Sequence, residues 1–164
     1  MNDAWSREWP DLSGLLVGQR HLLPIRVYYE DTDFSGIVYH ANYLRFMERG
    51  RTDFLRLHGV GHTALGAGEH GEPLAFAVRS MALEFLAPAR IDDLLIVETV
   101  PALMGGARFT IDQRVLRVGD ETEDSVLVTA RVTVALIGGD GRPRRIPPGL
   151  RAQIASTPED GAGA

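Results

Sequence analysis

The stretch ANYLRFMERGRTDFLRLHG, residues 41–59, decides the fold because it carries the one long helix pattern of the chain. Apolar or small residues recur in it at intervals of three and four, which places them on one face of a helix. These positions are Tyr43, Phe46, Met47, Gly50, Phe54 and Leu57, and the polar positions elsewhere include Arg45, Glu48, Arg49, Arg51 and Asp53. The pattern predicts a helix that begins near Ala41 or Asn42 and ends before Gly59 and Gly61.

Gly50 lies in the middle of the predicted helix. A glycine in a helix interior costs about 1 kcal/mol relative to alanine, so its presence predicts a helix backbone pressed closely against another element. A tolerated defect is the alternative interpretation.

The segments around this helix favour strands that pair with one another. One alternating segment precedes the helix, at residues 21–30, and four follow it, at residues 74–85, 94–100, 107–118 and 125–137. Short turns between the last four predict antiparallel pairing, and a short helix candidate runs from residue 147 to 154. The expected fold is therefore α+β, with an antiparallel sheet of about five strands wrapped around one long central helix. The other face of the sheet should be half apolar, which predicts a homodimer or homotetramer.

Length and composition are those of one globular domain. The chain has 164 residues, of which 45% are hydrophobic and 24% are charged, and this balance supports a single core. We expect an N-terminal extension at residues 1–20, a single domain at residues 21–155 and a disordered tail at residues 156–164.

The charged residues exclude several functions. The formal net charge is −5, which offers no general attraction for nucleic acid or an anionic membrane. The sequence has no cysteine and no lysine, so all 17 basic residues are arginine. A cysteine nucleophile, a thiolate metal site, a disulfide and a Schiff-base lysine are thereby excluded. No stretch is apolar enough to span a membrane, and no secretory signal pattern opens the sequence, so we expect a cytoplasmic location.

The segment from Glu30 to Tyr43 is the best candidate for chemistry. It joins a strand end to a helix start and so combines carboxylates with the backbone amides at the positive end of a helix. A carboxylate can attack a carbonyl or activate water, and a helix N-terminal amide can hold the developing oxyanion, so the segment suits acyl transfer. In the alternative interpretation Asp31 and Asp33 only form hydrogen bonds within a turn.

The sequence DTDFSGIVYHANY at residues 31–43, followed by FMERGR at residues 46–51, resembles the hot-dog-fold acyl-CoA thioesterases of the 4-hydroxybenzoyl-CoA thioesterase superfamily. The likeness is greatest to the thioesterase associated with the Tol-Pal cell-envelope system, and it covers roughly residues 20–147. It implies the fold reached above and makes Asp33 the catalytic aspartate, as general base or nucleophile. It further implies that the His40 amide polarises the thioester carbonyl, and that the His40 side chain is a second catalytic candidate.

Further residues are candidates for substrate contacts or for other chemistry. The resemblance implies that Gly36 and Tyr39 lie beside the substrate. Gly36 would let the backbone turn close to the thioester. Arg142, Arg144 and Arg145 could bind the phosphates of coenzyme A, although a solvated basic cluster is the alternative. Glu48 is either a solvated helix residue or an auxiliary active-site carboxylate, and Ser35 is a turn residue. His58 and His62 have glycines between them and no third ligand, so we expect no metal, and no cofactor is required.

The resemblance predicts a thioester hydrolase that converts an acyl-CoA to a carboxylic acid and free coenzyme A. Two alternatives share the expected fold. One is a hydratase or dehydratase that acts on acyl thioesters, and the other is a non-catalytic domain that binds acyl-CoA. Only the hydrolase releases a thiol.

Overall fold

The computed structural model describes residues 11–119 and 124–156 of the chain. The strands in these residues are β1 (Leu15–Val17), β2 (Arg20–Arg26), β3 (Leu74–Phe85), β4 (Leu94–Met104), β5 (Arg108–Arg117) and β6 (Ser125–Gly138). The helices are a short 3-10 turn, η1 (Tyr29–Asp31), and three α-helices, α1 (His40–Leu57), α2 (His62–Gly66) and α3 (Pro148–Ala155).

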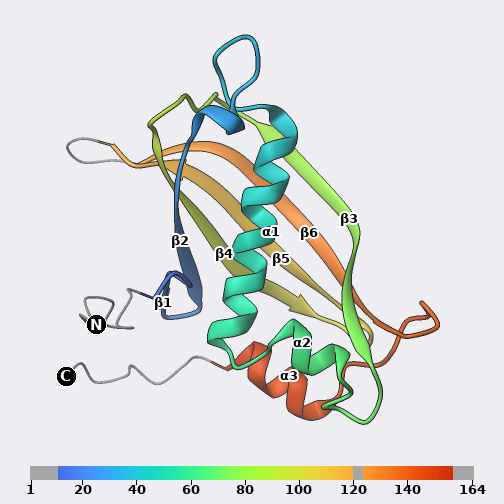
Figure 1. Ribbon diagram of the computed structural model, residues 1–164. Coiled ribbons are helices and arrows are strands. Elements are labelled where there is room, and N and C mark those ends of the chain that lie inside the picture. Colours follow the sequence, from blue (N-terminus) through green and yellow to red (C-terminus); the bar gives the residue numbers. More distant parts are fainter. Residues whose placement is uncertain (1–10, 120–123, 157–164) are drawn as a thin grey trace, which may run out of the picture.

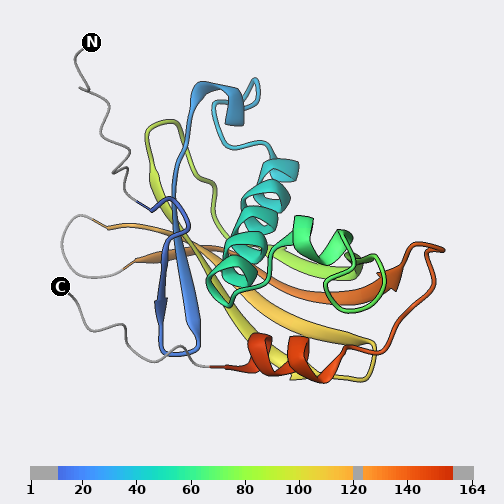
Figure 2. The same cartoon turned by 60° about the horizontal axis from the view of Figure 1, so that its bottom comes forward.

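The strands form one antiparallel sheet in the order β1-β2-β4-β5-β6-β3. The long helix α1 lies across one face of the curved sheet, and the two short helices α2 and α3 gather near its C-terminal end (Figure 1). Figure 2, which brings this end forward, shows the strands curving around α1. The predicted α+β fold, a sheet wrapped around one central helix, is confirmed.

The core lies between α1 and the concave face of the sheet. The periodic face of the helix contributes Phe46, Met47, Phe54 and Leu55, each at most 3% exposed. Along β5, Phe109, Ile111 and Val115 are buried while their neighbours are more exposed, so alternate residues of this strand face the core. The apolar spacing of the sequence thus selects both which helix face and which strand face is buried.

Gly50 marks the closest approach of α1 to the sheet. A Cβ atom built there would lie 2.8 Å from Val97 Cγ1, 3.0 Å from Thr99 Oγ1 and 3.2 Å from Gln113 Nε2. Real Cβ contacts are almost never so short, so glycine is the residue that lets the helix backbone lie against β4 and β5. The close contact predicted from the mid-helix glycine is confirmed.

Four local features differ from the sequence-based expectations. The strand expected at residues 21–30 ends at Arg26, and Tyr29–Asp31 form the turn η1 instead. Residues Leu15–Val17 form β1 and pair with β2, so part of the expected N-terminal extension belongs to the sheet. The expected loop at residues 60–72 contains α2, whose Leu65 is buried. Strand β4 continues to Met104, past a register shift at Pro101, where the ladder irregularity accommodates the missing proline N–H. Residues 157–164, most of the expected tail, lie outside the described residues.

The sheet has a long open edge. Strand β3 pairs only with β6, so one side of its 12 residues carries backbone groups without a ladder partner among the described residues. The outer sheet face also carries charge, because Arg131 forms a two-point ion pair with Asp112 at 2.7 Å across its middle. The β3 edge is therefore the stronger candidate for self-association.

Candidate active site

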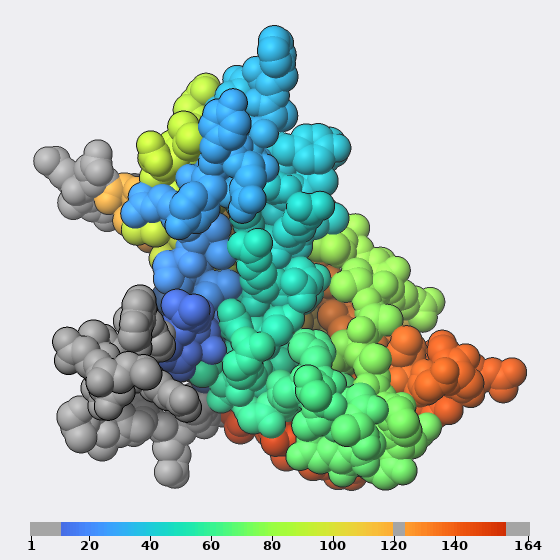
Figure 3. Space-filling view, viewed as in Figure 1, coloured from blue at the N-terminus to red at the C-terminus, as the bar shows by residue number. Residues whose placement is uncertain are grey.

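A tight loop between β2 and α1 holds four of the predicted site residues. At its tip the backbone N–H of Asp33 donates to the Ile37 carbonyl at 2.9 Å, and the N–H of Gly36 donates to the Asp33 carbonyl at 3.0 Å. Gly36 has a φ of +77°, in the left-handed region that favours glycine, so the turn requires this residue type. The loop stands out at the upper end of the molecule (Figures 1 and 3).

Asp31, the first aspartate of the loop, is buried and holds the loop to the helix. Its Oδ2 accepts a hydrogen bond from the Tyr28 N–H at 2.8 Å, and its Oδ1 accepts one from Asn42 Nδ2 at 3.0 Å. The Tyr39 N–H also donates to the Asp31 carbonyl, at 2.9 Å. These bonds fix the loop against the first turn of α1.

Asp33, the second aspartate, is exposed at the loop tip. Its Oδ1 accepts hydrogen bonds from the Ser35 hydroxyl and, at 2.8 Å, from the Ser35 N–H. The pKa of Asp33 is lowered by these two bonds and, to a smaller extent, by the nearby His40. The side chain is therefore a carboxylate at neutral pH, and its Oδ2 has no hydrogen-bond partner in the described part of the chain. Ser35 serves as the turn residue that its position predicts.

Tyr39 and His40 stand where the loop enters α1. His40 is the first residue of the helix, so its N–H belongs to the first-turn amides, which have no partner within the helix and lie at its positive end. The His40 ring lies 4.7 Å from the Tyr39 ring and 6.2 Å from the Phe85 ring, measured between centroids. Both aromatic contacts position the imidazole beside the end of β3.

Two hollows flank this loop. One, of about 560 Å³, is lined by Asp33, Gly36, Phe34 and Ile91. The other, of about 290 Å³, is lined by His40 together with the buried Tyr43 and the exposed Phe85. The structure thus brings Asp33, Gly36, Tyr39 and His40 into one segment whose two sides are both open to a ligand.

The three arginines predicted to bind the phosphates of coenzyme A, Arg142, Arg144 and Arg145, lie far from this loop in the structure. They follow the Gly138 end of β6, whereas the loop lies near Val128, which pairs with Phe85. Ten residues of strand separate these two levels, or roughly 33 Å. Arg144 is also engaged, since Nε donates to Glu72 Oε1 at 2.9 Å and Nη2 lies 3.1 Å from Asp140 Oδ1. Within one chain the arginine cluster does not reach the loop, because the two lie at opposite ends of the sheet.

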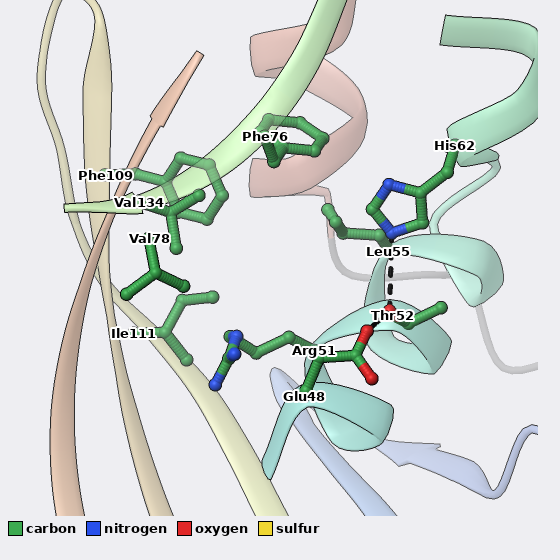
Figure 4. Close-up of a pocket in the computed structure, with 10 residues that line it drawn as sticks. All are labelled: Glu48, Arg51, Thr52, Leu55, His62, Phe76, Val78, Phe109, Ile111 and Val134. Atoms are coloured by element: carbon green, nitrogen blue, oxygen red, sulfur yellow. Dashed lines mark hydrogen bonds between the residues drawn. The ribbon is translucent and has the colours of Figure 1, made fainter. Parts of the chain in front are cut away.

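A separate cavity of about 100 Å³ lies between the second half of α1 and strands β3, β5 and β6 (Figure 4). Its polar residues are Glu48, Arg51, Thr52 and His62. Apolar side chains from α1 and the strands form its walls, namely Leu55, Phe76, Val78, Phe109, Ile111 and Val134. We refer to it as the α1 cavity.

The α1 cavity corrects the placement of Arg51, which the helix pattern puts among the outward polar positions. Arg51 is half-buried, points toward the sheet, and donates from Nη1 to Gln113 Oε1 at 2.9 Å. A signal was present in the sequence, since Arg51 is four residues after Met47 and four before Leu55, both on the buried face. Its long side chain bends from the edge of this face into the core.

His58 and His62 bind different partners, so the two do not approach a shared ion. Both ring nitrogens of His58 face carbonyl oxygens, of Phe54 at 2.7 Å and of Ser156 at 3.0 Å. His62 Nε2 lies 3.3 Å from Thr52 Oγ1. Among residues 11–119 and 124–156, no three metal-ligating side chains gather closely enough to hold a metal ion.

The sequence of the chain is similar to that of one family of known proteins. The sequence profile of the thioesterase-like superfamily matches residues 27–154. The acyl-CoA thioester hydrolase YbgC of Escherichia coli O6:H1 is 41% identical over 132 residues, which is 80% of this chain and 92% of the relative.

Solved structures share the fold. A probable thioesterase from Bartonella henselae is 49% identical, with a TM-score of 0.72 over 78% of this chain and 99% of that one. The 4-hydroxybenzoyl-CoA thioesterase of Pseudomonas sp. strain CBS-3 is only 20% identical but has a TM-score of 0.75, over 82% of this chain and 99% of that one. The second likeness shows the hot-dog fold alone.

Proposed function

The chain belongs to the thioesterase-like superfamily, and from this membership we propose that it hydrolyses acyl-CoA thioesters at the loop that carries Asp33 and His40. The family makes it a thioester hydrolase, and the YbgC relative, at 41% identity, supports coenzyme A as the thiol. The observation that carries the proposal is the pairing of an ionised, exposed carboxylate with a helix N-terminal amide in one loop.

In the proposed mechanism Asp33 either attacks the thioester carbonyl carbon or activates the water that attacks it, while the His40 N–H donates to the carbonyl oxygen. As the oxygen becomes negative, this hydrogen bond strengthens, which lowers the barrier. The tight turn at Gly36 leaves backbone space for the thioester, and Tyr39 lines its path. In this proposal the His40 imidazole, which lies beside Phe85, forms a hydrogen bond with the reacting groups.

Two routes have balanced steps. As a general base, Asp33 takes a proton from water while the water oxygen bonds to the carbonyl carbon. The C–S bond then breaks, its electron pair leaves with the coenzyme A sulfur, and the proton on Asp33 passes to this thiolate, which restores the carboxylate. As a nucleophile, the Asp33 carboxylate forms an acyl anhydride and expels coenzyme A, and water then cleaves the anhydride. Both routes require Asp33 ionised, which its hydrogen bonds with Ser35 favour.

We further propose a homodimer formed through the open β3 edge, in which each copy adds residues to the site of its partner. Two antiparallel copies of β3 paired about its middle bring the Leu74 end of one beside the Phe85 end of the other. The α1 cavity and the arginine cluster of one copy then approach the loop of its partner. This arrangement lets Arg142 and Arg145, both exposed, meet the phosphates of coenzyme A bound by the partner, while Arg144 braces the cluster. A homotetramer would pair two such dimers.

The proposed setting is the cytoplasm, with acyl-CoA as the substrate. In the described part of the chain no helix is both long and apolar enough to cross a membrane.

Titration of released thiol tests the reaction directly. The chain has no cysteine, so the protein contributes no thiol background when acyl-CoA substrates are incubated with it. We expect release of coenzyme A in step with the carboxylic acid. Hydration of an unsaturated acyl-CoA without thiol release would instead identify a hydratase. Tight binding without turnover would identify a non-catalytic domain.

Isotope labelling separates the two routes. In a single turnover in H₂¹⁸O, a nucleophilic Asp33 can acquire label in its carboxylate when water cleaves the anhydride at the aspartyl carbon. A general base leaves Asp33 unlabelled and places the label only in the product acid. Label in the peptide that contains Asp33, measured by mass spectrometry, therefore establishes the nucleophilic route.

Size-exclusion chromatography with light scattering tests the dimer. We expect a mass of at least twice the 18.0 kDa of the chain. A monomeric wild-type protein with full activity would contradict the composite site.

A further inference from the structure

The α1 cavity contains the positive charge of Arg51, on which the Glu48 carboxylate acts only from beyond ion-pair distance. No carboxylate oxygen of the described residues lies within ion-pair distance of Arg51, whose one hydrogen bond is to the neutral side chain of Gln113. Burial lowers the pKa of Arg51, but a guanidinium remains charged at any physiological pH. A half-buried guanidinium with unused N–H groups attracts a hydrogen-bond acceptor.

The position of Arg51 is fixed by a buried network. Gln113 is 1% exposed, and its Nε2 donates to the Met47 carbonyl and to Thr99 Oγ1, both at 2.9 Å. With Nε2 occupied, the amide orientation leaves Oε1 to receive Arg51. The guanidinium is thus preorganised at one wall of the cavity, and a ligand need not order it.

The other polar side chains stand toward the outer part of the cavity. Glu48 is exposed, and its Oε1 accepts a hydrogen bond from the Thr52 hydroxyl at 2.7 Å. His62 lies beyond Thr52, against the Phe76 ring (Figure 4). The Glu48 carboxylate repels an anionic ligand from this entrance, so an uncharged acceptor suits the cavity better than a carboxylate.

The walls and volume further limit the ligand. Apolar side chains of β3, β5 and β6 face Arg51 across the cavity, and they favour a carbon chain. The volume of about 100 Å³ is smaller than the roughly 150 Å³ that accommodates benzene in a protein interior. A group of a few carbons with one oxygen fits this space.

We propose that the α1 cavity receives an acyl group bearing an uncharged oxygen, as hydroxyl or ketone, and that Arg51 selects it by donating a hydrogen bond to that oxygen. The inference rests on the proposed thioesterase function and on the composite dimer, which brings the cavity of one copy beside the loop of the other. Arg51 is then a specificity-determining residue, remote from the bond that is cleaved.

Three thioesters of the same chain length test the selection. The probes are 3-hydroxybutyryl-CoA, acetoacetyl-CoA and butyryl-CoA, with kcat/KM measured by thiol release. Wild-type protein should favour at least one of the two oxygenated substrates over butyryl-CoA by about tenfold, the effect of one hydrogen bond to a charged group. Succinyl-CoA, whose acyl group ends in a carboxylate, should be the poorest of the four. Equal values for the three uncharged acyl groups, or a preference for succinyl-CoA, would overturn the proposal.

Substitution of Arg51 assigns the preference to its guanidinium. Arg51→Met should lower the ratio of kcat/KM for the preferred oxygenated substrate to kcat/KM for butyryl-CoA about tenfold. Arg45→Met is the matched control, since it removes an exposed guanidinium from the same helix and should leave the ratio unaltered. Arg51→Lys, which keeps a charge, should retain part of the preference. An unaltered ratio in folded Arg51→Met would refute the role of Arg51.

A binding experiment separates failure of the inference from failure of the proposed function. Calorimetric titration of Asp33→Asn with the same thioesters measures the preference without turnover. If wild-type protein releases no thiol from any substrate, the proposed function fails, and the ratio of dissociation constants still decides the cavity ligand. If thiol is released but neither kcat/KM nor binding favours an oxygenated acyl group, the inference alone fails.

Discussion

Two aspartates of one loop, Asp31 and Asp33, lie in opposite surroundings. The Asp31 carboxylate is 8% exposed and accepts hydrogen bonds from groups on both sides of the loop, the Tyr28 N–H and the Asn42 amide. The Asp33 carboxylate is exposed and uses one oxygen within its own turn, leaving the other open. Hydrogen-bond partners, rather than residue type, thus divide the structural aspartate from the proposed catalytic one.

The largest expected effect is the loss of turnover on removing Asp33. Asp33→Ala should lower thiol release by about 100-fold or more, as expected for a positioned base or nucleophile. Its midpoint of urea unfolding should stay near that of wild type, because an exposed side chain contributes little to stability. Turnover close to wild type would remove Asp33 from the mechanism.

Asp31→Ala should show the reverse pattern. The substitution leaves the Tyr28 N–H and the Asn42 amide without their acceptor in a buried site, which should lower the free energy of unfolding by about 2 to 4 kcal/mol. Urea unfolding followed by circular dichroism measures this loss, and thiol release should fall less than in Asp33→Ala at temperatures where the protein is folded. Equal free energies of unfolding for Asp31→Ala and Asp33→Ala would contradict the assignment of a structural role to Asp31 alone.

The length and regularity of each element determine how well the sequence predicts it. The presence and order of α1 and of the four strands after it follow from apolar spacing, although β4 extends past its expected end to Met104. The short elements β1 and α2 were missed since three or five residues set no measurable period. Leu65, the one buried residue of α2, becomes visible as an anchor only when the neighbouring strand is in place.

The sequence predicted the candidate site only for those residues that lie close together along the chain. Asp33 and His40 are seven residues apart within one loop, so a local motif places them together. The location of Arg142 and the inward course of Arg51 depend on the packing of strands far apart in the chain. No spacing rule along one segment supplies that information.

Ser35 provides a finer test, because it sets the ionisation of Asp33. The Ser35 hydroxyl and N–H both lower the pKa of Asp33. Ser35→Ala removes the hydroxyl and should raise this pKa toward its ordinary value. Since the mechanism needs the ionised form, activity that wild type retains at low pH should be lost at a higher pH in the variant, with little change at neutral pH.

The profile of kcat/KM against pH, on the acid side, measures this shift. Ser35→Thr keeps a hydroxyl and is the matched control, whose acid limb should stay closer to that of wild type. An acid limb that does not move in Ser35→Ala would mean that another group controls activity at low pH.

Thr32, between the two aspartates, should have the smallest effect. Its hydroxyl donates to the Tyr29 carbonyl at 2.9 Å in an exposed position, where water can replace it. Thr32→Ala should therefore change the free energy of unfolding by less than about 1 kcal/mol and kcat/KM by less than about twofold. A large loss of activity in this variant would show that the whole loop, and not the separate partners of Asp31 and Asp33, acts as the functional unit. Unfolding and thiol-release measurements on Thr32→Ala, made beside both aspartate variants, therefore decide whether the contrast between the two carboxylates is local to each.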